Sequence, residues 1–110
     1  MPQIHVINAI EVPAEMDEVA RQVRDTYVRY FSEQPGFVGS TFYKALDSGS
    51  SYSYINVVVW ESQEAFDAVV NAGFNNDEGE NDDGLKVLGK GFPPPIVVHP
   101  GRYEVIRSSS

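Results

Sequence analysis

The 110-residue sequence contains no cysteine, which excludes disulfide bonds, thiolate metal ligands and a cysteine nucleophile. Basic residues are scarce as well: eight Lys and Arg stand against 16 Asp and Glu, so the formal net charge is −8. Such a charge repels nucleic-acid phosphates and anionic membrane surfaces, and neither is an expected partner. No apolar run approaches the length of a membrane span, and the first residues lack the pattern of a secretory signal. We therefore expect a cytoplasmic protein.

The length and composition of the chain indicate one ordered globular domain over residues 1–110. Hydrophobic residues make up 42% of the sequence and charged residues 22%, which distinguishes it from a disordered chain. An acidic loop is expected at 74–84 and a solvated tail at 108–110. A chain this short buries only about two-thirds of its unfolded surface, so a partner subunit would add to a modest core.

Hydropathy periodicity predicts strands and helices in an order that is typical of one small fold. The expected elements are a strand over 3–12, a helix from Pro13 to a stop at 34–36, strands over 37–46 and 52–60, a helix over 62–71, a short helical turn over 85–88 and a strand over 101–107. On the long helix, Arg21, Arg24 and Arg29 are assigned to the polar side. This order predicts the α+β class, with a ferredoxin-like split βαβ arrangement on one antiparallel sheet.

The segment Ile55–Trp60 is apolar on both of its faces, which is typical of a strand that is covered from both sides. In a split βαβ arrangement the two helices cover only one face of the sheet. The opposite face then needs a second sheet, and a second copy of the chain related by a two-fold axis is the simplest supplier. We therefore expect a homodimer that forms a dimeric α/β barrel.

Several familiar site motifs are incomplete in this chain. The glycine-rich stretch 84–91 resembles a phosphate-binding loop, but Gly91 stands where a Ser or Thr must ligate magnesium. The carboxylates of 77–83 do not have the spacing of a calcium loop. His5 and His99 lack a second histidine at ligand spacing on a helix. Neither a nucleotide nor a metal is therefore expected.

Two asparagines interrupt the apolar faces of the expected central strands. Strand alternation places Asn56 on one face with Tyr54, Val58 and Trp60, and Asn8 occupies a similar position in the first strand. A buried amide without a partner costs roughly 1 to 3 kcal/mol, so each needs a reason to be there. The two amides could line one pocket, or they could bond to each other or to the backbone, and the residues alone favour the second reading.

Two stretches of the sequence resemble the antibiotic biosynthesis monooxygenase family. They are the turn QPGFV at 34–38 and the strand SYINVVVWES at 53–62, which is followed by Glu64-Ala65-Phe66. The resemblance extends over about 4–107, and it implies a dimer of ferredoxin-like subunits. The combination of Asn8, Asn56 and Trp60 looks most like the cofactor-independent oxygenases that convert anthrone-type aromatic polyketides into quinones.

The resemblance implies a monooxygenase (oxidoreductase) that uses molecular oxygen to oxidise an electron-rich aromatic or quinol substrate to a quinone, without flavin, haem or metal. It makes Asn8, Asn56 and Trp60 the candidate catalytic residues. The candidate substrate-binding residues are Tyr54, Phe66, Phe31, Phe42 and Phe74. Haem-degrading relatives need a histidine ligand on a helix, and no histidine lies between Trp60 and His99. The alternative function is a non-catalytic dimeric protein of the same fold that binds small molecules or takes part in stress responses.

Overall fold

The computed structural model describes residues 3–73 and 92–109 of the chain. The expected acidic loop at 74–84, the expected helical turn at 85–88 and the candidate residue Phe74 lie outside the described residues. No helix in the described part of the chain is long and apolar enough to cross a membrane.

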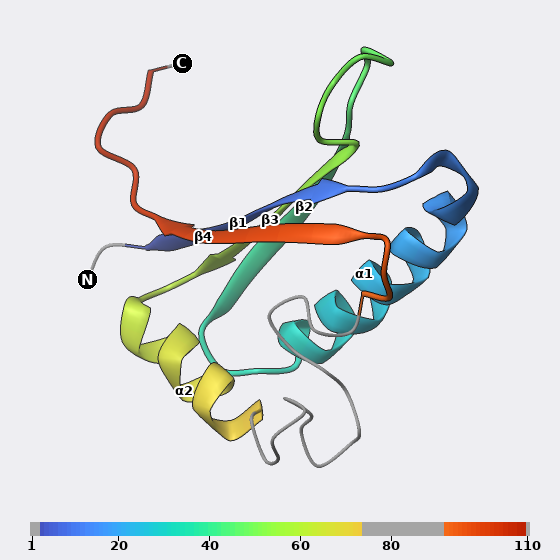
Figure 1. Ribbon diagram of the computed structural model, residues 1–110. Helices are drawn as coiled ribbons and strands as arrows, with labels where there is room; N and C mark the ends of the chain where they lie inside the picture. Colours follow the sequence, from blue (N-terminus) through green and yellow to red (C-terminus); the bar gives the residue numbers. More distant parts are fainter. Residues whose placement is uncertain (1–2, 74–91, 110) are drawn as a thin grey trace.

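Four strands and two α-helices follow one another in the expected order. The elements are β1 (Ile4–Glu11), η1 (Ala14–Met16), α1 (Asp17–Ser32), β2 (Phe37–Lys44), β3 (Tyr54–Trp60), α2 (Gln63–Gly73) and β4 (Val97–Tyr103). The strands form one antiparallel sheet in the order β2-β3-β1-β4, and both helices lie against the same face of it (Figure 1). This arrangement confirms the ferredoxin-like α+β fold, with the first and third strands at the centre.

The position of the last strand differs from the prediction. The sequence predicts a strand over 101–107, whereas β4 begins at Val97 and ends at Tyr103. Its pairing with β1 passes through Pro100, which lies opposite Asn8. The predicted strand thus began four residues too late, and an edge strand such as β4 tolerates Pro100 because it can include a residue without a backbone N–H.

A tight turn joins α1 to β2 at Gly36. Its φ of 90° lies in the left-handed region that favours glycine. A Cβ atom at this position would also lie 2.5 Å from the Cβ of Ala65 on α2. The turn therefore holds the start of β2 close against α2.

Two apolar clusters fill the space between the sheet and the helices. The first consists of Ile4, Val6, Tyr27, Phe31, Val58, Trp60, Phe66 and Val69. The second consists of Ile10, Val12, Ala20, Tyr54 and Ile96. Asn8 and Asn56 are directly opposite each other in the β1–β3 register, and they occupy the strand positions between the two clusters. The asparagine pair therefore interrupts a core that would otherwise be continuous.

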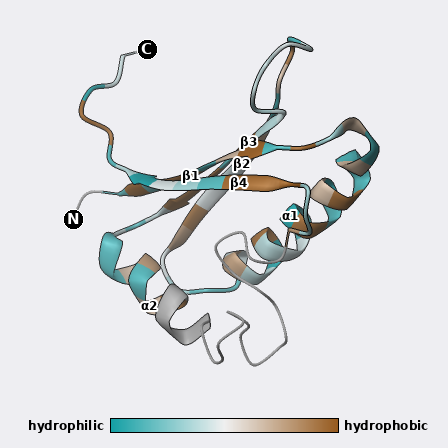
Figure 2. Ribbon diagram, viewed as in Figure 1, coloured by the Kyte–Doolittle hydropathy of each residue, from teal (hydrophilic) through white to brown (hydrophobic). Residues whose placement is uncertain are grey.

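The other face of the central strands is apolar but only half-buried. Its central side chains are Ile7, Ala9, Ile55, Val57 and Val59. Hydrophobic stretches mark the strands in Figure 2, and neither α1 nor α2 covers this side of the sheet (Figures 1 and 2). We refer to these five residues as the open face.

Candidate functional site

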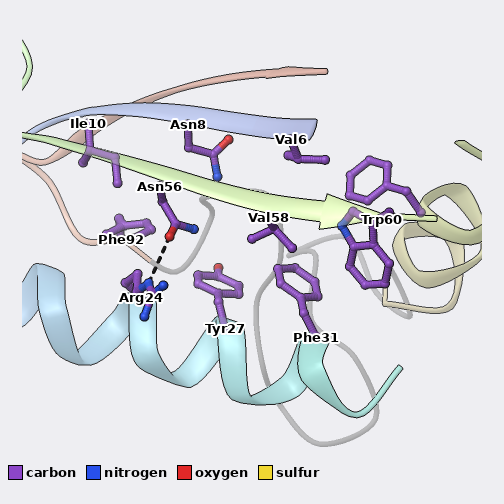
Figure 3. A pocket seen from close by; sticks show the side chains of 11 residues that line it. Val6, Asn8, Ile10, Arg24, Tyr27, Phe31, Asn56, Val58, Trp60 and Phe92 are labelled. Carbon is purple, nitrogen blue, oxygen red and sulfur yellow. Dashed lines mark hydrogen bonds between the residues drawn. The ribbon is translucent and has the colours of Figure 1, made fainter. Parts of the chain in front are cut away.

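A pocket lies between the central strands and α1, at the place where the two apolar clusters meet (Figure 3). Its walls are formed by Val6, Asn8, Ile10, Asn56, Val58 and Trp60 from the sheet, Arg24, Tyr27 and Phe31 from α1, Phe66 from α2, and Phe92. The cavity volume is about 30 Å³, which is enough for roughly one or two water molecules. All three candidate catalytic residues thus line one small, largely apolar pocket.

Arg24 holds the side chain of Asn56 in a defined orientation. Arg24 Nε donates a hydrogen bond to Asn56 Oδ1 over 2.9 Å, and Asn56 is only 6% exposed. Because a guanidinium has donors and no acceptor, it identifies which atom of the amide is the oxygen. Figure 3 shows the amide nitrogen of Asn56 turned away from Arg24. The amide therefore presents N–H donors to the pocket.

Two other contacts place the guanidinium of Arg24 against β2. Its Cζ lies 4.9 Å from the centroid of the Phe42 ring, within the range of a cation–π interaction. Its Nη2 donates to Ser40 Oγ over 3.4 Å. The Arg24 side chain is 15% exposed and lies at the wall of the pocket.

The assignment of Arg24 to the polar side of the helix was wrong. The buried residues of α1 are Ala20, Tyr27 and Phe31, and position 24 completes their spacing of i, i+4, i+7 and i+11. The helical period therefore places Arg24 on the sheet-facing stripe in spite of its charge. This spacing was the signal in the sequence that could have identified it.

Two buried polar atoms at the pocket have no hydrogen-bond partner within the described structure. They are Asn8 Oδ1 and the indole nitrogen Trp60 Nε1. Native proteins rarely leave such atoms unpaired, because each costs about 1 to 3 kcal/mol. The carbonyl oxygen of Asn56 accepts a hydrogen bond from Arg24, and Asn8 Oδ1 has no partner within the described structure. The alternative in which the two amides bond only to each other or to the backbone therefore does not describe this site. An acceptor and a donor therefore stand unpaired at the pocket.

The candidate substrate-binding residues fall into two groups. Phe31 and Phe66 line the pocket. Phe42 and Tyr54 instead stack on each other outside its wall, with ring centroids 4.9 Å apart. Phe74 lies outside the described residues.

Tyr54 is occupied by contacts with α1. Its hydroxyl donates to Asp17 Oδ1 over 3.2 Å and accepts from Arg21 Nε over 3.4 Å. The hydrogen bond with Tyr54 raises the pKa of Arg21, so this guanidinium stays charged. These contacts anchor the first half of α1 to β3.

Tyr27 and Phe92 also line the pocket, although neither was a candidate. Their rings stack with centroids 6.0 Å apart. Tyr27 could have been found from its place on the apolar stripe of α1. No periodic pattern marks Phe92, which reaches the pocket from just before β4.

The residues around the pocket do not fit a haem group or a metal ion. The only two histidines of the chain, His5 and His99, are absent from the pocket lining. His99 Nε2 instead contacts Glu11 Oε2 on β1. The described residues also contain no group of three or more histidines and carboxylates that could hold a metal.

Comparison with known proteins adds a family and a set of similar folds. The sequence model of the family described as antibiotic biosynthesis monooxygenase matches residues 3–73. No curated protein sequence matches the chain significantly. A solved structure of SnoaB, a cofactor-independent oxygenase from Streptomyces nogalater, is 17% identical with a TM-score of 0.71, and the alignment covers 98% of this chain and 97% of SnoaB.

Two further solved structures share the fold. The heme-degrading protein Rv3592 from Mycobacterium tuberculosis is 25% identical with a TM-score of 0.64, over 99% of this chain and 97% of Rv3592. A dimeric ferredoxin-like protein from an uncultured marine organism is 12% identical with a TM-score of 0.66, over 99% of this chain and all of the other. The ferredoxin-like fold is therefore shared by proteins with different activities.

Proposed function

The chain belongs to the antibiotic biosynthesis monooxygenase family, and from this premise we propose that it is a cofactor-independent monooxygenase that oxidises an electron-rich aromatic or quinol substrate to a quinone. One observation carries the proposal: within the described part of the chain, Asn8 Oδ1 and Trp60 Nε1 are buried without a hydrogen-bond partner at a largely apolar pocket that Asn56 also lines. SnoaB, which has a similar fold, is a cofactor-independent oxygenase and supports the same reading.

The reaction needs no redox group if the substrate itself supplies the electrons. An anthrone-type substrate loses a proton to water, and the resulting anion gives one electron to O2. The carbon radical and superoxide then combine to form a C–O bond, and protonation gives a hydroperoxide. Loss of water from this hydroperoxide breaks the second C–H bond and the O–O bond, leaving a carbonyl. One CH2 group and one O2 thus become one C=O group and one H2O.

The pocket residues have separate tasks in this scheme. The Asn56 amide N–H groups and the Trp60 indole N–H donate to the substrate oxygen on which negative charge collects. Asn8 Oδ1 accepts a hydrogen bond from a substrate hydroxyl. The surrounding apolar side chains keep water away from the anion, which strengthens each of these interactions.

Entry of an aromatic substrate requires the pocket to widen. Ligand pockets for drug-sized molecules typically have volumes of about 300 to 1,000 Å³, whereas this cavity measures about 30 Å³. Asn8, Asn56 and Trp60 are held by strand pairing on both sides of β3 and β1. We therefore expect the wall formed by α1 and Phe92 to move when the ring binds.

We also propose that the protein is a homodimer in which the open faces of two copies pack together. The open face consists of five apolar side chains that are only half-buried in the single chain. Sheet-on-sheet packing would remove them from water, and a two-fold axis makes the face complementary to itself. A protein of similar fold that is described as dimeric supports the formation of a dimer. Light scattering of the purified protein should give twice the mass of 12.2 kDa.

The activity is tested by incubating the purified protein with anthrone in air while oxygen uptake and anthraquinone absorbance are recorded. We expect protein-dependent uptake with one quinone formed per O2. Asn56→Ala should lower the rate by a factor of about 10² to 10³, as for the loss of one oxyanion donor. Trp60→Phe, which keeps a large ring but removes the N–H, should also lower it.

Ser51→Ala serves as a control, because Ser51 is exposed in the loop between β2 and β3. This variant should retain the full rate. Absence of uptake by the folded protein would favour the second candidate function, a non-catalytic protein that binds small molecules. A haem or flavin absorbance spectrum on the isolated protein would contradict a cofactor-free reaction.

A further inference from the structure

We propose that Arg24 makes the pocket selective for aromatic hydroxyl compounds that bind as anions, and that it positions Asn56 to meet the anionic oxygen. This inference rests on the proposed function and deepens it, because it names the ionisation state of the substrate and adds a residue to the site. The charge of Arg24 lies on the stripe of α1 that faces the sheet, with a side chain that is only 15% exposed.

Among the residues that the structure describes, no carboxylate pairs with Arg24 on the side of the pocket. Among the described residues, its ion-pair partner is Asp25, whose Oδ1 lies 3.2 Å from Arg24 Nη1. The Asp25 side chain is 68% exposed, so water screens its charge. The guanidinium also contacts neutral groups: Asn56 Oδ1 at the pocket, and Ser40 Oγ and the Phe42 ring on β2. A bound anion would therefore meet a positive field from α1.

The unpaired polar atoms define the rest of the ligand. Trp60 Nε1 requires an acceptor and Asn8 Oδ1 requires a donor, because neither has a partner within the described structure. The Asn56 amide nitrogen offers further donors, since Arg24 holds the oxygen of that amide. A molecule with an ionised oxygen and a second, un-ionised hydroxyl or N–H satisfies all of them. A cationic ligand would place its charge near Arg24 at a site with little water, which is unfavourable. The chemical class is therefore a flat aromatic with an acidic hydroxyl group.

Arg24 also sets the direction of the Asn56 amide. A guanidinium presents donors in a planar arrangement, so Nε–H can only hold Oδ1 and leaves the NH2 group for the ligand. Lysine at this position would keep the charge but lose the planar geometry of Nε. The two roles of Arg24, charge and orientation, are therefore separable by substitution.

The test measures the pKa of a bound phenol and does not depend on turnover. The probe is 4-nitrophenol, because its phenol and phenolate forms absorb at different wavelengths, and 4-nitroanisole is the matched probe that cannot ionise. With saturating wild-type protein, we expect the pKa of bound 4-nitrophenol to fall by about one to three pH units, as for an acid beside a cation. Arg24→Gln should abolish this fall and weaken phenolate binding by a factor of ten or more, while binding of 4-nitroanisole changes little.

Arg24→Lys should retain part of the fall in the probe pKa but lower the affinity for the phenolate, because Asn56 is no longer held. Arg29→Gln is the matched control, since Arg29 lies on the same helix, carries the same charge and is exposed. It should leave the probe pKa unchanged. Thermal unfolding of each variant shows that the fold is intact.

Equal probe pKa values in wild-type protein and in folded Arg24→Gln would overturn the role of Arg24. An equal effect of Arg29→Gln would also overturn it, because the field would then come from the whole protein. The oxygen-uptake assay gives an independent answer. A protein that lowers the probe pKa through Arg24 but consumes no oxygen supports this inference and contradicts the monooxygenase.

Discussion

The two faces of the sheet use the same strands in opposite ways. The face beneath the helices is buried, yet it carries Asn8, Asn56 and the N–H of Trp60. The open face is only half-buried, yet its central side chains are all apolar. In each strand the two kinds of residue alternate, so that Val57 lies between Asn56 and Val58 and points to the other side.

Each face therefore contains residues that the stability of an isolated chain does not explain. Buried polar atoms without partners lower stability, and half-buried apolar residues gain only part of the stabilisation that full burial gives. Both patterns are explained if each face has a binding partner: a polar aromatic ligand on one side and a second sheet on the other. Polar groups on the covered face and apolar side chains on the open face thus indicate function on both faces.

The largest effect is expected from a charge on the open face. Val57→Lys places an unpaired cation at the centre of the proposed interface on β3, and burying such a charge costs about 3 to 5 kcal/mol. We expect a monomer at concentrations where the wild-type protein is a dimer. Sedimentation or light scattering over a dilution series measures the change.

Leu46→Lys is the control for this substitution, because Leu46 is 100% exposed in the loop after β2. It adds the same charge away from the open face and should leave the dimer intact. A Val57→Lys protein that remains dimeric would show that the subunits meet elsewhere.

A smaller effect is expected when the covered face is made to resemble the open one. Asn8→Leu removes the unpartnered Oδ1 and should raise the free energy of unfolding by about 1 to 2 kcal/mol, because a buried unsatisfied group is replaced by an apolar one. The same change should lower oxygenase activity, as is common when a site residue is replaced by a better core residue. Urea unfolding and oxygen uptake are measured on the same samples.

Gln22→Leu provides the comparison for Asn8→Leu, since it replaces an exposed amide on α1 by the same side chain. Its effect on stability should stay within about 0.5 kcal/mol. If Asn8→Leu destabilises the protein, then Asn8 is a structural residue. In that case Asn8 Oδ1 would no longer count as one of the two unpaired atoms that indicate a ligand.

The smallest effect is expected at the rim of the covered face. Arg102 Nη1 and Asp67 Oδ1 are 2.8 Å apart, but both side chains are about half-exposed. Such pairs contribute about 1 kcal/mol or less, so Asp67→Asn should change unfolding and activity only slightly. A loss of more than about 2 kcal/mol would mean that surface charge, rather than the apolar clusters, holds α2 to β4.

Much of the fold could be predicted because, in most helices and strands, the hydropathy period of the sequence matches the pattern of buried residues. Alternation along β3 correctly placed Tyr54, Asn56, Val58 and Trp60 on one face. Prediction failed where one residue type was read in isolation. Arg24 was assigned to the polar side of the helix because it is charged, although its spacing places it with the buried residues.

The site was harder to predict than the fold. Strand pairing was enough to relate Asn8 to Asn56, which lie opposite each other, whereas Trp60 joined them through the family resemblance. Phe92 could not, since its position depends on a path of the chain that has no hydropathy period. Strand patterns likewise do not predict that the Asn56 amide bonds to Arg24, because this contact depends on side-chain conformations.

The residues that line the pocket differ in how freely they can be substituted. Asn8, Asn56 and Trp60 belong to the two innermost strands, where a change of backbone would disturb a ladder on each side. Tyr27, Phe31 and Phe66 belong to helices, whose side chains can be exchanged for others of similar volume without altering that ladder. Redesign of substrate preference should therefore begin on the helices, with the strand chemistry left intact.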